Sequence, residues 1–118
     1  SDARGTINDI FFNENIHHVN IIKSTPGAIR GNHYHKESIQ HMLMTKGSLE
    51  YWYKPVDSKE PAVMVVAHEG DLVSTPPNEI HALRICPEGN EFITFATGKR
   101  GGQNYESDTF RVDSIIPE

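Results

Sequence analysis

Apolar side chains recur at alternate positions through most of the chain, in short runs that are separated by turn-forming residues. Such alternation is typical of half-buried β-strands, because successive side chains of a strand point to opposite faces. The runs lie at 6–12, 17–23, 28–35, 39–45, 48–54, 62–67, 71–75, 80–86, 91–97 and 110–116. The pattern predicts an all-β chain. A helix within 36–46 is the alternative, which Ile39, Thr45 and Gly47 disfavour.

The gaps between the runs are short and rich in proline, glycine, asparagine and aspartate, as turns require. Many short strands with a turn after about every 8–12 residues indicate a β-sandwich or β-barrel. A length of 118 residues suits one hydrophobic core. We therefore expect residues 1–118 to form a single domain.

The alternation also assigns faces to individual side chains. Leu49, Tyr51 and Tyr53 share one face of their predicted strand, which suits the inside of a barrel. In the strand at 39–45, Gln40 lies on the face of two methionines, whereas His41 points the other way. We therefore expect Gln40 on the inside and His41 on the outside.

The net charge of -5 and the absence of a basic run exclude a nucleic-acid backbone binder, which needs clustered lysine and arginine. The one cysteine, Cys86, cannot form a disulfide within the chain, which fits a reducing compartment. The chain has neither an apolar run of about 20 residues nor a signal-peptide pattern. These features predict a cytoplasmic protein that does not enter a membrane.

Seven histidines are a high count for this length, and their spacing points to a site. His33 and His35 lie two apart, so in a strand both point to the same face with Cα atoms roughly 6.5–7 Å apart. Two imidazoles at that separation can converge on a metal ion or an anionic substrate. We expect this pair to line the inside of a small β-barrel together with Gln40 and His81.

The spacing of these residues resembles the two sequence motifs of the cupin superfamily. The residues that match the first motif are Gly27, His33, His35, Gln40 and Gly47, with glutamine where the motif has glutamate. The residues that match the second motif are Gly70, Pro76 and His81, with Asn78 in place of a glycine and Ile85 in place of the final asparagine. The resemblance implies a double-stranded β-helix of the jelly-roll type, commonly dimeric. It also implies a divalent metal held by the positions of His33, His35, Gln40 and His81.

A second resemblance is narrower. The segments 2–5 (DARG) and 30–34 (RGNHY) resemble the dTDP-4-dehydrorhamnose 3,5-epimerases and the sugar-nucleotide 3,4-ketoisomerases. Those proteins are cupins without a metal. The resemblance implies that Arg30 contacts a phosphate and that a histidine of the following motif acts as the base.

The donor set itself suits a divalent transition metal, such as Zn, Fe, Ni, Mn or Cu. Three neutral imidazoles and one amide oxygen are ligands that these ions accept, and positions stay open for water or substrate. Gln40 carries no charge, so affinity for the hard cations magnesium and calcium should be low. The alternative is that the three histidines are polar lining without a metal.

An acid–base role fits the same residues. His33 or His35 could remove a proton next to a keto group while its partner stabilises the enolate. Gln40 would then orient an imidazole, and Arg30 would bind a phosphate or carboxylate through two hydrogen bonds. The alternative for Arg30 is a surface ion pair.

We therefore expect isomerase- or epimerase-type chemistry on a carbohydrate or sugar-nucleotide derivative. The alternatives are a metal-dependent oxygenase and a non-enzymatic cupin that senses a small molecule. The expected partners are an anionic or sugar-derived small molecule and a second copy of the chain. The polar segment 98–109 is either a solvated connection or a flap, in which Lys99, Arg100 and Tyr105 would close over an anionic ligand.

Overall fold

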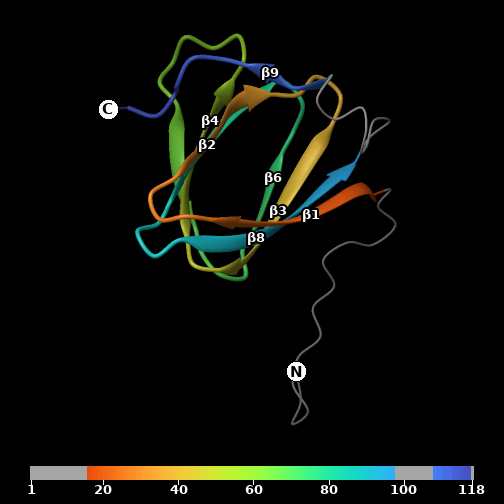
Figure 1. Ribbon diagram of the computed structural model, residues 1–118. Helices are drawn as coiled ribbons and strands as arrows, with labels where there is room; N and C mark the ends of the chain where they lie inside the picture. Colours follow the sequence, from red (N-terminus) through yellow and green to blue (C-terminus); the bar gives the residue numbers. More distant parts are fainter. Residues whose placement is uncertain (1–15, 98–107, 118) are drawn as a thin grey trace.

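The computed structural model describes residues 16–97 and 108–117 (Figure 1). Within them the chain forms β-strands only. The strands are β1 (Ile16–Ser24), β2 (Ile29–Tyr34), β3 (Ile39–Lys46), β4 (Leu49–Pro55), β5 (Val63–Ala67), β6 (Leu72–Thr75), β7 (Glu79–Ile85), β8 (Asn90–Thr97) and β9 (Phe110–Arg111). The all-β prediction is confirmed, and the helix considered for 36–46 is wrong because β3 occupies that segment.

Three features of the sequence fall outside this part of the chain. They are the strand predicted at 6–12, the segment 2–5, and the possible flap with Lys99, Arg100 and Tyr105. The strand predicted at 110–116 is shorter than expected, since only Phe110 and Arg111 pair with β2. None of the described residues belongs to a helix that is long and apolar enough to span a bilayer.

The strands form two antiparallel sheets that face each other (Figure 1). One sheet has the order β1-β8-β3-β6 and the other has the order β5-β4-β7-β2-β9. This confirms the jelly-roll prediction. Within the described residues, however, no strand of one sheet pairs with a strand of the other, so the sheets form a sandwich and not one closed barrel.

The hydrophobic core fills the space between the inner faces. Met44, Leu49, Ile85 and Phe92 are almost completely buried there. The predicted faces of β4 are confirmed, because Leu49 and Tyr51 are buried while Glu50 forms an ion pair with Arg84 at 3.4 Å. Alternation along β4 therefore separates apolar and aromatic side chains inside from a charged side chain outside, as the sequence pattern predicted.

The register between β2 and β7 changes once, at a β-bulge. Arg30 lies opposite Leu83, but His33, three residues later, lies opposite His81. Leu83 and His81 are two residues apart and both are buried. The extra residue of the bulge thus places Arg30 and His33 on the same face, although simple alternation would put them on opposite faces.

The bulge depends on two residues with positive φ, Gly31 (φ 90) and Asn32 (φ 57). A Cβ at position 31 would lie 2.7 Å from the carbonyl oxygen of His81. Two backbone N–H groups of the C-terminal segment hold Asn32: that of Val112 donates to its carbonyl and that of Ile115 to its Oδ1, each at 2.9 Å. Position 31 therefore requires glycine for space as well as for conformation.

Another residue with positive φ lies in the turn before β7. Asn78 has φ 63 at the position where the cupin motif has a glycine, and asparagine tolerates this conformation better than most residues. Its N–H donates to the carbonyl oxygen of His35 at 2.7 Å. This hydrogen bond ties the two histidine-bearing segments together.

We expect the substitution Gly31→Ala to destabilise the protein by about 3 kcal/mol or more, because positive φ costs about 1–2 kcal/mol and the clash with His81 adds to that cost. Gly70→Ala is the matched control, since Gly70 has the same φ of 90 but nothing lies within 4 Å of the added Cβ. Urea denaturation of both variants measures the difference. Equal losses of stability would show that crowding at the bulge is unimportant.

Candidate functional site

Three histidines meet between the two sheets. The ring centroids of His33 and His81 are 4.6 Å apart, those of His33 and His35 are 5.0 Å apart, and those of His35 and His81 are 5.6 Å apart. One ring nitrogen from each histidine lies within 4.8 Å of those of the other two. The structure therefore brings together the three histidines that the sequence analysis had grouped.

The β2–β7 pair creates this meeting. His33 and His81 are direct cross-strand partners, so their side chains emerge side by side. His35 follows the end of β2, with Tyr34 between the two histidines. The ring of Tyr34 stacks on that of Phe110, with centroids 5.3 Å apart, so Tyr34 has a packing role.

Hydrogen bonds define which nitrogen carries the proton in two of the rings. A carbonyl oxygen can only accept, so His35 Nδ1 donates to the Asp108 carbonyl at 3.0 Å and His81 Nδ1 donates to the Glu79 carbonyl at 3.4 Å. In both rings the neutral form then keeps its lone pair on Nε2. His33 Nδ1 is buried without a hydrogen-bond partner among the described residues.

The site strongly favours neutral imidazoles. Burial, together with the charges that His81, His35 and Arg111 can carry, lowers the pKa of His33 to about 3. Burial and His35 lower the pKa of His81 to about 4. Both rings are therefore uncharged at neutral pH, which is the form that coordinates a metal ion.

A cavity of about 430 Å³ reaches this cluster from the outside. His33, His81 and Gln40 line it, together with Arg30, Arg111 and apolar side chains of both sheets. The two arginines are exposed, whereas His81 is buried and His33 is partly buried. The cavity thus combines positive charge at its outer part with neutral imidazoles inside.

The predicted site residues have different surroundings in this cavity. Gln40 faces inward and His41 outward, as expected, and His41 Nδ1 is hydrogen-bonded to Ser74 Oγ at 2.7 Å. Arg30 Nε donates to Ser24 Oγ at 2.8 Å, and among the described residues it makes no ion pair. His35 is only 1% exposed and lies behind the cavity wall.

These residues fit a divalent transition metal. Three neutral nitrogen donors lie close together. The buried Nδ1 of His33 has no hydrogen-bond partner among the described residues, and a metal ion could bind a ring that is left in this state. Gln40 supplies an amide where many such sites have a carboxylate, so the described donors carry no negative charge. A hard cation such as magnesium fits this set poorly.

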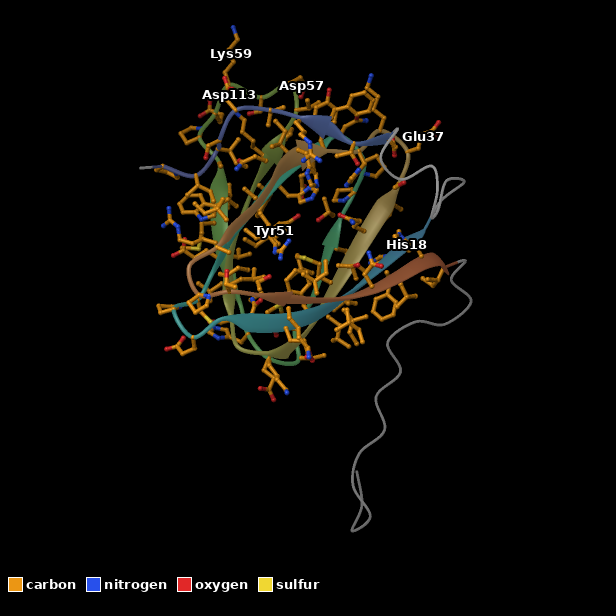
Figure 2. The ribbon with its side chains drawn as sticks, viewed as in Figure 1. His18, Glu37, Tyr51, Asp57, Lys59 and Asp113 are labelled. Atoms are coloured by element: carbon orange, nitrogen blue, oxygen red, sulfur yellow. The ribbon has the colours of Figure 1, made fainter. Side chains whose placement is uncertain are left out.

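Tyr51 lies in the interior between the sheets (Figure 2). Its ring is next to that of His81. The two rings are nearly parallel, with centroids 6.3 Å apart and an interplanar angle of 9°. The Tyr51 hydroxyl is hydrogen-bonded to Thr75 Oγ1 and donates to Glu79 Oε1 at 3.2 Å. Burial raises the pKa of Tyr51 and that of Glu79. The strand pattern predicts the inward position of Tyr51 but not its contact with the histidine cluster.

Asp108 and Arg111 are the other residues that the sequence analysis missed. Burial alone would raise the pKa of Asp108, but hydrogen bonds from the backbone N–H groups of Lys36, Ser38 and Glu37 outweigh it and hold this pKa below its ordinary value. Arg111 pairs with His33 across β2 and β9. Both residues lie 70 or more positions from their partners in the first motif, and no spacing in the sequence points to them.

The chain matches the family described as the polysaccharide biosynthesis C-terminal domain over residues 1–110. Two solved structures with sugar-related names are similar. CapF, a capsular polysaccharide assembling protein from Staphylococcus aureus, has a TM-score of 0.73 and 18% identity, and the match covers 92% of this chain and 32% of the CapF chain. A 3,4-ketoisomerase from Helicobacter canadensis has a TM-score of 0.73 and 22% identity, with 94% of this chain and 83% of its own covered.

Two further solved structures are also similar to this chain. The dTDP-6-deoxy-D-glucose-3,5-epimerase RmlC from Legionella pneumophila has a TM-score of 0.71 and 15% identity, with 95% of this chain and 67% of its own covered. A tryptophan-to-phenylalanine variant of Bacillus subtilis oxalate decarboxylase has a TM-score of 0.65 and 32% identity, with 85% of this chain and 25% of its own covered. These similarities confirm the resemblance to cupins, and the names of three of these four proteins are those of enzymes.

The chain spans about a third of the length of the CapF chains that it matches. No curated protein sequence is similar enough to count as a relative.

We expect the free energy of unfolding of the metal-free protein to fall as the pH falls from about 6.5 to about 4. The unfolded chain takes up protons on its histidines near pH 6.5, whereas folded His33 and His81 resist protonation down to about 3 and about 4. Urea denaturation at a series of pH values tests this. The fall in the free energy of unfolding with falling pH should be less steep in His33→Gln than in the wild-type protein. His68→Gln is the control, because residue 68 is exposed and its substitution should leave the pH dependence unchanged. A ring of His33 or His81 that titrates near pH 6.5 in NMR spectra would refute the expectation.

Proposed function

The chain belongs to the polysaccharide biosynthesis C-terminal domain family, and on that premise we propose that it carries out isomerase- or epimerase-type chemistry on a sugar nucleotide. The observation that supports this most is the cavity itself. Its inner end holds neutral imidazoles, and its outer part holds two exposed arginines. In this proposal residues 1–118 form a single domain that contains the whole site. The protein would be cytoplasmic, which fits the free thiol of Cys86.

The arginines select an anionic ligand. Arg30 and Arg111 line the same cavity, in a chain whose net charge is -5. A guanidinium binds phosphate oxygens with two parallel hydrogen bonds and stays charged at any physiological pH. A cavity of about 430 Å³ has the usual size for a small-molecule site. The diphosphate of a sugar nucleotide would lie at the arginines, with its sugar directed toward the histidines.

His33, His35 and His81 would hold a divalent transition metal, with Gln40 beside them. Zn, Fe, Ni, Mn and Cu all accept neutral imidazole donors. When bound, such an ion polarises a carbonyl group and makes the neighbouring C–H group more acidic. Gln40 is a hydrogen-bonding group on the same cavity wall and can orient the sugar without adding charge.

The metal-free route is the weaker one on physical grounds. It needs His33 or His35 to remove the proton next to the keto group. His33 reaches the cavity, but a pKa of about 3 makes it a weak base. His35 lies behind the wall and is 1% exposed, so a sugar could not reach it without rearrangement. As metal ligands, the histidines need neither a high pKa nor contact with the sugar, and the proton of the acidified C–H group would pass to solvent in the cavity.

Two other functions use the same residues. The 32% identity with the oxalate decarboxylase variant favours a second candidate, which is metal-dependent chemistry on a small acid. Within this candidate the chain would act as a metal-dependent oxygenase if it consumed oxygen. A cupin that binds its ligand without turnover is the non-enzymatic alternative. The three functions differ in what happens to the ligand, and one set of measurements separates them.

Isomerase-type chemistry should exchange solvent deuterium into a nucleoside-diphosphate 4-keto sugar at the carbon next to the carbonyl. Mass spectrometry detects the exchange, and elemental analysis of the purified protein identifies the metal. Metal retention should be lost in His33→Ala and His81→Ala but kept in His68→Ala. Oxygen uptake with an iron-loaded protein, or binding of the sugar without any exchange, would contradict the proposal and favour the oxygenase or the sensor.

Arg30→Ala should raise the KM for the sugar nucleotide about tenfold or more with little change in kcat, since it removes a contact with the distant phosphate. Arg84→Ala is the matched control, because Arg84 lies on the outer face in its ion pair with Glu50. Equal effects of the two substitutions would mean that Arg30 contributes only general charge.

We also propose that the protein is a homodimer through the outer face of the sheet β1-β8-β3-β6. One row across this face reads Ile21, Ile93, Leu43 and Leu72 from strand to strand. Ile21, at the end of this row on the edge strand β1, is 66% exposed, so the apolar face continues to the edge of the sheet.

The size and charge of this face favour a second copy of the chain. The neighbouring row reads Val19, Phe95, His41 and Ser74, so neither row contains a carboxylate or an ammonium group. Two copies with a net charge of -5 each can approach there with the least repulsion. Four strands about 4.8 Å apart and about seven residues long give a face of about 450 Å² in projection. This is the order of size of an interface that buries about 800 Å² on each partner.

Light scattering after size-exclusion chromatography should give twice the monomer mass, and Ile21→Asp should convert the protein to a folded monomer. Val65→Asp is the matched control, because Val65 is also an exposed apolar residue but lies on β5, at the edge of the other sheet. A monomeric wild-type protein would refute the dimer. Dissociation by Val65→Asp alone would move the interface to β5.

A further inference from the structure

Asp108 is the only buried carboxylate among the described residues, and it lies beside the histidine cluster. Its side chain accepts three hydrogen bonds from consecutive backbone N–H groups. Lys36 donates to Oδ1 at 3.0 Å, while Glu37 and Ser38 donate to Oδ2 at 3.1 Å and 3.0 Å. The carboxylate thus fixes the loop that begins directly after His35.

The backbone carbonyl of the same residue has a separate partner. It accepts the hydrogen bond from His35 Nδ1 at 3.0 Å. Asp108 therefore holds both the ring of His35 and the chain that follows it. The carbonyl oxygen of His35 is held from another side, by the N–H of Asn78 at 2.7 Å. The ring that is held in this way lies beside those of His33 and His81.

A role in stability alone would explain the three backbone hydrogen bonds. It does not explain why the backbone carbonyl of Asp108 accepts a hydrogen bond from the ring of His35, a residue of the site. In metal sites, the second ring nitrogen of a histidine ligand almost always donates to a carboxylate or a backbone carbonyl, which sets the tautomer and the ring orientation. The carbonyl of Asp108 has this position relative to His35, and its own carboxylate keeps it there.

We propose that Asp108 is a positioning residue, whose anchored carbonyl holds His35 in the tautomer with the proton on Nδ1 and the lone pair on Nε2. The effect on metal binding rests on the proposed function, in which His35 is a metal ligand. The effect on the tautomer does not, because it concerns a hydrogen bond that exists without a metal. The two parts can therefore be tested separately.

The first measurement is the tautomer of His35 in the metal-free protein. Long-range ¹H–¹⁵N correlation spectra of ¹⁵N-histidine-labelled protein distinguish a protonated Nδ1 from a protonated Nε2. Wild-type protein should show the Nδ1-protonated form. In Asp108→Ala the loop 36–38 loses its three acceptors, the carbonyl is no longer fixed, and a mixture of tautomers should appear.

The second measurement is the dissociation constant for Zn²⁺, from competition with a chromophoric chelator at fixed pH. Asp108→Ala should weaken zinc binding about 10–100-fold, the usual effect of losing a group that orients a ligand. Asp108→Asn should have a smaller effect, since its amide oxygen can keep the hydrogen bonds from Glu37 and Ser38. Asp113→Ala is the matched control, because Asp113 is an exposed aspartate of the same C-terminal segment (Figure 2).

Circular dichroism first establishes that each variant is folded, and Asp108→Asn replaces Asp108→Ala in both measurements if the latter does not fold. The proposal is overturned if the folded variant keeps one tautomer and binds zinc within twofold of wild type. It is also overturned if Asp113→Ala has the same effects. If wild-type protein binds no zinc but the tautomer changes in Asp108→Ala, the metal site fails and the positioning role stands.

Discussion

Strand β2 pairs with β7 in a register that changes once, at Gly31, and the site is built on that change. Before the bulge the pairing places Arg30 opposite Leu83, and after it His33 lies opposite His81. Without the extra residue, the arginine and the histidine would occupy opposite faces of the sheet. The bulge therefore combines an anion-binding group and an imidazole in one cavity. It exists because residue 31 has no side chain that would meet the backbone of β7.

The electrostatics of the interior narrow the possible chemistry. Burial and mutual repulsion hold His33 and His81 in the neutral form, which improves them as ligands and weakens them as bases. Gln40 adds no charge, so the described lining of the cavity has no anion to stabilise an imidazolium. The positive charges lie farther out, on Arg30 and Arg111. An anionic ligand would therefore be held by its charged end while its uncharged part faces the histidines.

The C-terminal segment completes the site from outside the two cupin-like motifs. Its backbone holds the bulge at Asn32, Arg111 pairs with His33, and Asp108 anchors both His35 and the loop that follows. Each of these contacts joins residues that are far apart in the sequence. A segment that contributes only two residues to a sheet thus fixes three features of the cavity.

The sequence alone determined the strands from β1 to β8, the sides of β4 and β3 that face inward, and the group of His33, His35 and His81. It could do so for the strands and their faces because alternation is a local property, and for the histidine group because the spacings within both segments resemble the two cupin motifs. It could not locate the bulge, since nothing local distinguishes a glycine in a regular strand from one that approaches another backbone. The inward position of Arg30 and the roles of Asp108 and Arg111 depend on strand pairing across more than 50 residues. Only the tertiary structure decides such contacts, because they arise from which strands pair and in which register.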